Sequence, residues 1–287
     1  MNYALNKTLI IVENLIESGA ANAGVCPFSA VADRLTGYTA HRLPENPQTV
    51  ISAVFPYNIG VNPKNMARYV CLPDYHVWVG SALIKASEKL RELFPGSYFV
   101  PFCDASPIPE VYAAALAGLG KIGRHGLLIT QKYGSWVHIG ELVTDMRING
   151  ESVSLTDNVC DGCGECVRAC PAGVLTRRGC REDGHEKAAA SAMPDKDKKS
   201  RCVSALTQKK GELSPEEKAL LKKAQTVWGC DVCQNVCPRN RGATLATQKF
   251  ENVITELTAS TPLEGRAFAW RGKEVLERNL KISSTVG

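Results

Sequence analysis

Apolar residues in the first half of the chain follow two periods in turn. Some segments repeat apolar positions every three to four residues, as amphipathic helices do, and others are short continuous apolar runs typical of buried strands. The helical segments are residues 9–16, 81–94 and 109–120, and the strand segments are 49–57, 97–105 and 125–130. Helices and strands that alternate in this way predict an α/β domain that extends to about Ile148.

The pattern changes near residues 149–157. From Asn158 onward cysteines become frequent and short loops replace the apolar strands, as expected where metal bonds substitute for part of a hydrophobic core. Residues 181–200 are polar and predict an exposed insertion, whereas residues 271–282 predict one amphipathic helix. We therefore expect three parts, at residues 1–150, 151–245 and 246–287.

Composition and charge narrow the class of protein. The chain has 287 residues, 44% of them hydrophobic, and a formal net charge of +5. Its N-terminus interrupts the apolar run with residues such as Lys7 and Glu13, unlike a signal peptide, and no stretch reaches the roughly 18 apolar residues of a membrane span. We expect a cytoplasmic protein without a membrane partner, while the sequence leaves the oligomeric state open.

A mixed-sign stretch at residues 177–223 carries a good part of the positive charge. This stretch is either a solvated surface or a binding face for an acidic electron donor or a nucleic acid. The solvated surface is the simpler interpretation.

Seven of the twelve cysteines fall in two spaced runs, which points to metal binding because disulfides are rare in a reducing compartment. The first run has the spacing C-x2-C-x2-C-x3-C followed by Pro171, as in bacterial ferredoxins. The second run repeats the later half before Pro238, and Cys202 supplies its missing thiolate. In paired runs of this kind the last cysteine of one run binds the cluster of the other.

The spacing therefore predicts two [4Fe-4S] clusters. The expected ligands are Cys160, Cys163, Cys166 and Cys237 for one cluster, and Cys170, Cys202, Cys230 and Cys233 for the other. Zinc is the main rival, but zinc sites seldom use a third cysteine at this spacing before a proline. Cys180 is an alternative to Cys202. The remaining thiols, Cys26, Cys71 and Cys103, are interpreted as small buried hydrophobic residues.

The segment GLGKIG, with Gly118, Gly120 and Gly123, formally matches a dinucleotide-binding fingerprint. That fingerprint needs a strand before it and a helix after it, whereas here the predicted order is the reverse. A Rossmann site is therefore rejected, and the glycines are interpreted as a sharp turn that can approach a flat ligand closely.

Several longer motifs carry a family resemblance. The segments ARYVCLPDYH (67–76), DASPIPE (104–110), AGLGKIGRHGLLI (117–129) and KYGSWVHIGELVTDM (132–146), with RCVSALT around Cys202 and GCDVCQNVCPRN around Cys230, resemble the epoxyqueuosine reductase family. The resemblance runs from about Val50 to Asn240. It implies a cobalamin-binding α/β domain, related in fold to that of reductive dehalogenases, joined to a ferredoxin-like double-cluster module. Electrons would pass through the clusters to cobalamin, which deoxygenates an epoxide on a modified tRNA base.

The resemblance also implies roles for individual residues. Asp104 matches the acidic residue that protonates the substrate oxygen, a task suited to a carboxylic acid with a raised pKa, whereas without the resemblance it could be a helix N-cap. The expected cobalamin-binding residues are Arg68, Tyr69, Asp74, Tyr75, His76, Gly120, Lys121, Ile122, Gly123, His125, Gly134, Ser135 and Trp136. His76 is not expected to bind cobalt, because a lone histidine is more often a hydrogen-bonded structural residue.

Two departures from the family bear on the substrate. The family has a glycine-tryptophan pair where this chain has Gly120 and Lys121, and typical members continue into helical repeats that grip the tRNA, of which residues 261–279 resemble the start. The expected function is a cobalamin-dependent reductase acting on tRNA epoxyqueuosine or on another reducible carbon–oxygen bond, with a ferredoxin or flavodoxin as donor. The alternatives are a two-cluster electron carrier or reductive activator of a corrinoid partner, and a double-cluster structural or regulatory module.

Overall fold

The computed structural model of the chain describes residues 3–36, 38–148, 153, 163–175 and 200–284. These residues form two compact units. The first unit holds the described residues up to Pro56, Tyr75–Gly123 and those from Leu127 to Val153, and the second holds Tyr57–Asp74, Arg124–Gly126 and those from Cys163 onward. The structure thus groups residues 57–74 with the half that carries the cysteine runs. The domain boundaries expected from the sequence, near residues 150 and 245, stay predictions.

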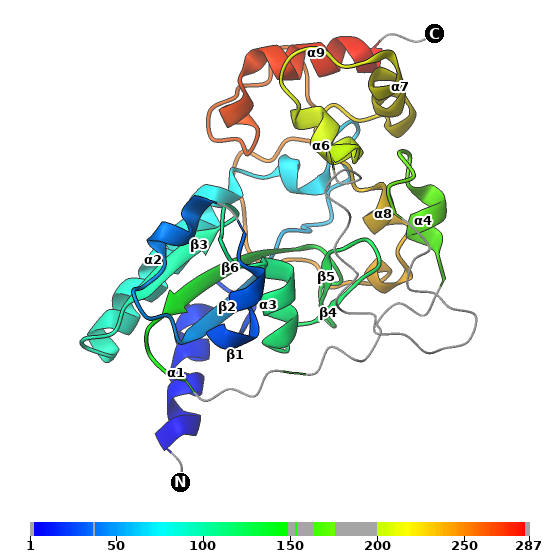
Figure 1. Ribbon diagram of the computed structural model, residues 1–287. Coiled ribbons are helices and arrows are strands. Elements are labelled where there is room, and N and C mark those ends of the chain that lie inside the picture. Colours follow the sequence, from blue (N-terminus) through cyan, green and yellow to red (C-terminus); the bar gives the residue numbers. More distant parts are fainter. Residues whose placement is uncertain (1–2, 37, 149–152, 154–162, 176–199, 285–287) are drawn as a thin grey trace. The chain divides into compact units, whose positions relative to one another are not determined.

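The first unit is built on a four-stranded antiparallel sheet with the order β1-β2-β6-β3 (Figure 1). The strands are β1 (Asn22–Pro27), β2 (Thr49–Pro56), β3 (Phe99–Cys103) and β6 (Val137–Thr144). Because successive side chains of a strand point to opposite faces, each face receives every second residue. Every residue of β2 from Thr49 to Phe55 is buried, so both faces of this central strand are covered.

One face of the sheet packs against the helices α1 (Tyr3–Glu17) and α2 (Tyr75–Leu93). Helix α2 buries a stripe of residues at helical spacing, Val79, Leu83, Ala86 and Leu90, against Ile51 and its neighbours on the sheet. Gly140 on β6 permits this close packing, because a Cβ there would lie 2.8 Å from Cδ1 of Leu83. The result is the largest apolar layer of the first unit.

The opposite face packs against the short helix α3 (Glu110–Leu116), which is rich in alanine. Ala113, Ala114 and Ala115 are fully or almost fully buried, and small side chains let the helix approach the sheet closely. Gly24 on β1 completes this contact, since a Cβ there would lie 2.3 Å from the carbonyl oxygen of Ala117. After α3 the chain forms a small hairpin of β4 (Lys121–Ile122) and β5 (Leu128–Ile129).

The second unit consists of short helices around a smaller core. Its helices are α4 (Glu165–Ala169), α6 (Val203–Gln208), α7 (Pro215–Ala224), α8 (Val232–Asn235) and α9 (Lys273–Ser284). Val203, Leu206, Leu213, Leu221 and Ile282 form the buried cluster that joins α6, α7 and α9. None of the described helices of either unit is long and apolar enough to cross a membrane.

The secondary structure confirms most of the expected elements. The helices at 9–16 and 81–94 are parts of α1 and α2, the strands at 49–57 and 97–105 are β2 and β3, and the last expected helix is α9. The expected strand at 125–130 shrinks to the two residues of β5, and β1 and β6 were not predicted. Apart from Ser200, the expected insertion at 181–200 lies outside the described residues.

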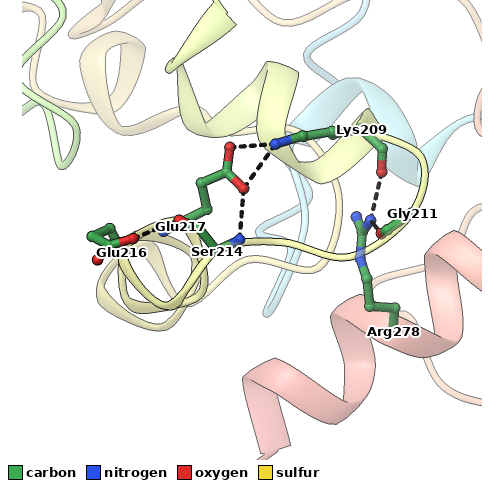
Figure 2. A network of polar contacts seen from close by, with 6 residues as sticks. All are labelled: Lys209, Gly211, Ser214, Glu216, Glu217 and Arg278. Atoms are coloured by element: carbon green, nitrogen blue, oxygen red, sulfur yellow. Dashed lines mark hydrogen bonds and ion pairs between the residues drawn. The ribbon is translucent and has the colours of Figure 1, made fainter.

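Helix α7 begins with a capping box, shown in Figure 2. The Ser214 hydroxyl accepts a hydrogen bond from the Glu217 backbone N–H at 3.2 Å, and the Glu217 carboxylate accepts from the Ser214 N–H at 2.8 Å. The same carboxylate pairs with Lys209, 2.7 Å away, while the Arg278 guanidinium donates to the carbonyl oxygens of Lys209 and Gly211. The network ties α6, α7 and α9 together.

Replacement of Ser214 with alanine should therefore lower the free energy of unfolding by about 1 kcal/mol, the usual cost of losing an N-cap side chain. Denaturant unfolding of the cluster-loaded chain measures the effect. Replacement of the exposed Glu212, which precedes the cap, with glutamine is the control. A Ser214→Ala variant as stable as the wild type would show that the cap contributes nothing here.

Candidate functional site

The catalytic candidate Asp104 follows β3 directly and has an unusual backbone conformation. Its φ angle is +58°, in the left-handed region that residues with a side chain seldom adopt. Such a conformation persists where the surrounding structure holds it, and it is found preferentially at functional sites. The side chain of Asp104 remains 61% exposed, so a substrate can reach it.

Asp104 contacts His76, the second residue of α2. His76 Nε2 lies 3.2 Å from Oδ2 of Asp104, and the two groups form an ion pair when the imidazole is protonated. The hydrogen bond with His76 and the imidazole charge, together with a hydrogen bond from Tyr75, hold the pKa of Asp104 below its ordinary value, although partial burial acts in the opposite direction. The expectation of a raised pKa was therefore wrong, because the sequence does not show that His76 faces this carboxyl group.

Stacked rings adjoin this pair. The Tyr75 ring stacks on His76, with centroids 4.1 Å apart, and on His138 of β6, with centroids 4.2 Å apart and an interplanar angle of 10°. Trp78 meets His138 edge-on at 5.7 Å. Tyr75, His76 and His138 are each half-buried, so the stack retains some accessible ring surface beside Asp104. The sequence analysis missed His138, although it lies within one of the motifs that carried the family resemblance.

The Asp104–His76 contact gives a prediction about titration. Replacement of His76 with glutamine removes the positive charge and should raise the pKa of Asp104 toward the ordinary aspartate value. Carbon NMR of side-chain carboxyl groups, with the Asp104→Asn spectrum as assignment, measures this shift. An unchanged or lower pKa of Asp104 in the His76→Gln variant would mean that the contact does not set the charge of this carboxyl group.

The glycine-rich segment lies between α3 and the β4–β5 hairpin. Gly118 has a φ of +77°, and a Cβ at Gly120 would lie 2.5 Å from the carbonyl oxygen of Ile129. Gly120 thus serves the close packing of the hairpin itself. Lys121 is exposed and Ile122 half-buried, while the backbone N–H of Gly123 donates to the Leu127 carbonyl at 2.9 Å.

The second glycine-containing segment, at residues 134–136, precedes β6. Gly134 has a φ of +56°, and its carbonyl oxygen accepts hydrogen bonds from the backbone N–H and the hydroxyl of Thr130, at 2.8 and 3.0 Å. Ser135 and Trp136 are buried. These two side chains therefore support the loop rather than present a surface to a ligand.

The other expected cobalamin-binding residues belong to the second unit. The backbone N–H of Arg68 donates to the carboxylate of Asp231 at 2.6 Å, and its guanidinium donates to the Val61 carbonyl and to Asn58. Tyr69 packs near Gly229, where a Cβ would lie 3.3 Å from the Tyr69 ring. The Asp74 backbone N–H donates to the Gly265 carbonyl at 2.9 Å. Arg68 is thus engaged within the loop that carries it and with the second cysteine run.

Asp231 lies between two expected cluster ligands, and the sequence analysis did not single it out. Burial raises its pKa to about 6, although the Arg68 N–H, the Arg68 charge and Gln234 act in the opposite direction. Gln234 Nε2 donates to Oδ1 of Asp231 at 3.1 Å. Asp231 therefore joins the 68–71 turn to the second cysteine run.

Three expected ligands of the first cluster line one small hollow. Cys163, Cys166 and Cys237 line it, together with Arg124, His125, Gly164 and Pro238. Gly164, with a φ of +67°, begins α4 and turns the chain between the first two of these cysteines. His125 is buried, and burial lowers its pKa to about 4, so this ring is neutral at neutral pH. Cys160, the fourth expected ligand, lies outside the described residues.

The expected ligands of the second cluster also lie near one another. Burial raises the pKa of Cys230 to about 11, and the nearby Cys202 and Cys170 raise it further. The pKa of Cys233 is raised mainly by burial and additionally by Cys230 and Cys202. Cys170 from the first run thus adjoins the second run, as the crossed ligand scheme requires. The full scheme stays a prediction, and Cys180, the alternative to Cys202, lies outside the described residues.

The three described cysteines of the first half of the chain that are not expected ligands lie in or near the apolar core. Cys26 and Cys71 are buried, and burial raises their pKa values to about 12 and about 11, which suits inert core thiols, whereas Cys103 is half-buried. Within the described ranges, no three His, Cys, Asp or Glu side chains converge as ligands of one metal ion.

Comparison with known proteins gives a consistent picture. The family described as 4Fe-4S double cluster binding domain matches residues 159–240. The epoxyqueuosine reductase of Listeria monocytogenes is 31% identical over 73% of this chain and 54% of its own length, and that of Escherichia coli K12 is 32% identical over 75% and 52%. The chain thus spans little more than half the length of these curated relatives.

Solved structures show the same fold. Epoxyqueuosine reductase from Streptococcus thermophilus matches with a TM-score of 0.77 and 24% identity, over 97% of this chain and 80% of that one. An epoxyqueuosine reductase crystallised with a modified tRNA-Tyr stem loop matches with a TM-score of 0.78 and 19% identity, over 98% and 81%. The curated relatives, the double-cluster match and this fold agree, and the chain belongs to the epoxyqueuosine reductase family.

Proposed function

We propose that the chain is an iron–sulfur- and cobalamin-dependent reductase that removes the epoxide oxygen of epoxyqueuosine in tRNA. Its family depends on both cofactors. The observation that carries the proposal is that one chain combines a double-cluster domain, in which three cysteines line one hollow, with an accessible carboxylate–imidazole pair beside stacked rings. An electron carrier alone would have no use for such a pair.

The cysteine groups fit iron–sulfur clusters. Their donor sets consist of thiols, which are ligands of iron–sulfur clusters and not of hard cations such as Mg²⁺. Three of the thiols line a hollow, and the buried thiols have raised pKa values, so cluster assembly must displace their protons. We propose the two ligand sets given above, with Cys170 and Cys237 exchanged between the runs.

The first unit offers a surface that fits a flat cofactor. The stacked rings of Tyr75, His76 and His138 are half-buried, and a planar macrocycle can pack on such a surface. We propose that Tyr75, His76 and the backbone around Gly120 and Lys121 hold cobalamin, whereas the buried Ser135 and Trp136 support the loop at Gly134. For Ile122, Gly123 and His125, and for Arg68, Tyr69 and Asp74 of the second unit, contact with cobalamin also remains a proposal.

The chain's own part in the reaction is to deliver protons and position the substrate. Removal of an epoxide oxygen as water, leaving a carbon–carbon double bond, consumes two electrons and two protons. Cobalamin, when bound, would supply the reducing power for the substrate carbon. Asp104 and His76 share a proton between Oδ2 and Nε2, and this pair is placed to protonate the oxygen as its bond to carbon breaks.

The remaining partners are part of the same proposal. A ferredoxin or flavodoxin would supply single electrons to the clusters, whose potentials can be low enough for cobalamin reduction. The substrate would be tRNA carrying epoxyqueuosine, as in the complex formed by the structural relative, and the reaction would take place in the cytoplasm.

The proposal is tested by turnover. The anaerobically reconstituted chain, loaded with clusters and cobalamin, is incubated with a low-potential reductant and epoxyqueuosine tRNA, and the digested nucleosides are analysed by mass spectrometry. We expect queuosine only when cobalamin, reductant and enzyme are all present. A fully loaded chain that forms no queuosine would contradict the proposal and favour the electron carrier.

A further inference from the structure

Glu141 is a fully buried carboxyl group at the centre of the first unit. It lies on β6, on the face of the sheet that packs against α3, and its exposed fraction is 0%. The strands and helix around it, β1, β2, β3 and α3, contain no lysine, arginine or histidine. Residues 28–43, which cover the same face, carry His41 and two arginines; the guanidinium groups of Arg34 and Arg42 lie over the rings of Tyr112 and Phe102, and neither forms an ion pair with Glu141 among the described residues. Burying a carboxylate without a paired cation costs free energy, so a glutamate at position 141 is unfavourable for stability unless it has another role.

Glu141 forms a hydrogen bond with residue 106, in the loop of residues 104–108 that follows β3 and carries Asp104. The hydroxyl of Ser106 donates to Oε2 of Glu141 at 2.7 Å and accepts a hydrogen bond from the Ile108 backbone N–H at 3.1 Å. Ser106 is only two residues from Asp104. Glu141 is therefore connected through one side chain to the turn that presents Asp104 to His76.

A second tether holds the same loop. The hydroxyl of Thr39 donates to the carbonyl oxygen of Ala105 at 2.8 Å, and the Thr36 backbone N–H donates to the Pro107 carbonyl at 2.8 Å. These bonds and the Ser106 contact fix consecutive residues after Asp104. Asp104 itself keeps a left-handed backbone conformation, which these surrounding contacts help to hold.

The polar atoms near Glu141 also argue against a purely structural role. Oε1 of Glu141 and the hydroxyl of Ser52, its direct cross-strand neighbour on β2, are buried and have no hydrogen-bond partner among the described residues. An apolar pair at these two positions would avoid that cost, and buried polar atoms left without partners are uncommon in folded proteins.

We propose that Glu141 is a positioning residue: through Ser106 it holds the Asp104 loop so that the carboxyl group of Asp104 meets His76. The inference rests on the proposed function where it concerns turnover, but the Glu141–Ser106 contact can be tested without any reaction. Glu141 touches neither substrate nor cofactor and acts through the loop.

The charge of Glu141 makes this arrangement sensitive to pH. Burial raises its pKa to about 7, and the hydrogen bond from Ser106 acts in the opposite direction. Of the nearby groups, the Cys26 thiol has a pKa of about 12, raised by burial and by Glu141, and remains protonated. Glu110 at the start of α3 adds no positive charge. Above pH 7 Glu141 therefore becomes a buried anion, and the hydrogen bond from Ser106, which favours the ionised form, becomes stronger.

Three variants of the cluster-loaded chain separate positioning from stability. Glu141→Gln keeps an oxygen that can accept from Ser106 but cannot ionise, and Ser106→Ala removes the tether. Ser87→Ala is the control, because it deletes the hydroxyl of a serine of the same unit that lies outside the loop. Ser87 is buried, whereas Ser106 is half-buried, and the Ser87 hydroxyl donates to the Phe99 carbonyl at 2.6 Å. Thermal unfolding of all three shows whether the loss of a buried hydroxyl alone accounts for any effect.

Infrared spectroscopy tests the contact directly. We expect a carbonyl band of a protonated carboxylic acid that titrates near pH 7, disappears in Glu141→Gln and shifts to higher frequency in Ser106→Ala, while Ser87→Ala leaves it unchanged. Absence of the band in the wild type, or a band that Ser106→Ala does not move, would overturn the inference. This experiment gives its answer even if the chain proves to have no reductase activity.

Measurements of turnover test whether the Glu141–Ser106 contact positions Asp104 for the reaction. Ser106→Ala should lower kcat by roughly 10- to 100-fold with little change in KM, the range expected when a catalytic group is displaced by about 1 Å. Glu141→Gln, which cannot ionise, should match the wild-type kcat at pH 6 and should lack the change in kcat across pH 7 that we expect of the wild type. A wild-type kcat and pH profile in Ser106→Ala, or a change in kcat across pH 7 that persists in Glu141→Gln, would overturn the positioning role.

Discussion

Replacement of Asp104 with asparagine is expected to lower turnover of epoxyqueuosine tRNA by roughly 100- to 10,000-fold, the range seen when a general acid is removed. Asparagine keeps the size of the side chain but can neither ionise nor share a proton with His76. Iron and cobalamin contents should stay at the wild-type level, because Asp104 belongs to neither cysteine group. Initial rates measured on equally loaded proteins provide the comparison.

Asp145→Asn is the matched control for this prediction. Asp145 lies just after β6, and its carboxylate accepts a hydrogen bond from the Tyr98 backbone N–H at 2.8 Å, beside the beginning of β3 rather than its end. The same chemical change there should leave turnover nearly unaltered. If Asp104→Asn turned over as fast as Asp145→Asn, Asp104 would have no place in the mechanism.

Replacement of Cys166 with serine is expected to remove one cluster and leave the other. Cys166 is buried and lines the same hollow as Cys163 and Cys237, so a serine there removes one of the proposed ligands of that cluster. The iron content should fall from about eight to about four per chain, the count of one remaining four-iron cluster. Iron analysis and electron paramagnetic resonance of the reduced protein measure the loss.

The crossed ligand scheme makes this prediction more specific. Cys237→Ser should remove the same cluster as Cys166→Ser, although residue 237 belongs to the other run, whereas Cys170→Ser should remove the second cluster. Cys26→Ala is the control, since this thiol is buried in the apolar core of the first unit. Loss of different clusters in Cys166→Ser and Cys237→Ser would contradict the scheme.

Elements with strong, uninterrupted patterns were predictable from the sequence. The stripe of α2 and the apolar runs of β2 and β3 are long enough to reveal their period, whereas β1 is only six residues long and ends in a proline. Strand β6 escaped prediction because polar residues such as His138 and Glu141 interrupt its apolar positions. The pairing of strands distant in sequence could not be read from local patterns at all.

The candidate site was also predictable only in part: local motifs were visible in the sequence, and contacts between distant residues were not. The spacing of the cysteines is local and encodes the cluster geometry, so it could be interpreted directly. The family resemblance brought Asp104 and His76 to notice, but only the structure shows that they are 3.2 Å apart and that the pKa of Asp104 is lowered. Glu141 and Asp231 looked like ordinary polar residues within motifs, because burial is a property of the folded chain.

The most direct test of the central claim is the cofactor content of the whole chain. The protein is reconstituted anaerobically with iron, sulfide and cobalamin, purified again, and examined by metal analysis and visible spectroscopy. The account predicts about eight irons, as two four-iron clusters require, and one retained cobalamin per chain. The same iron content without cobalamin would contradict the proposed reductase and leave a two-cluster electron carrier.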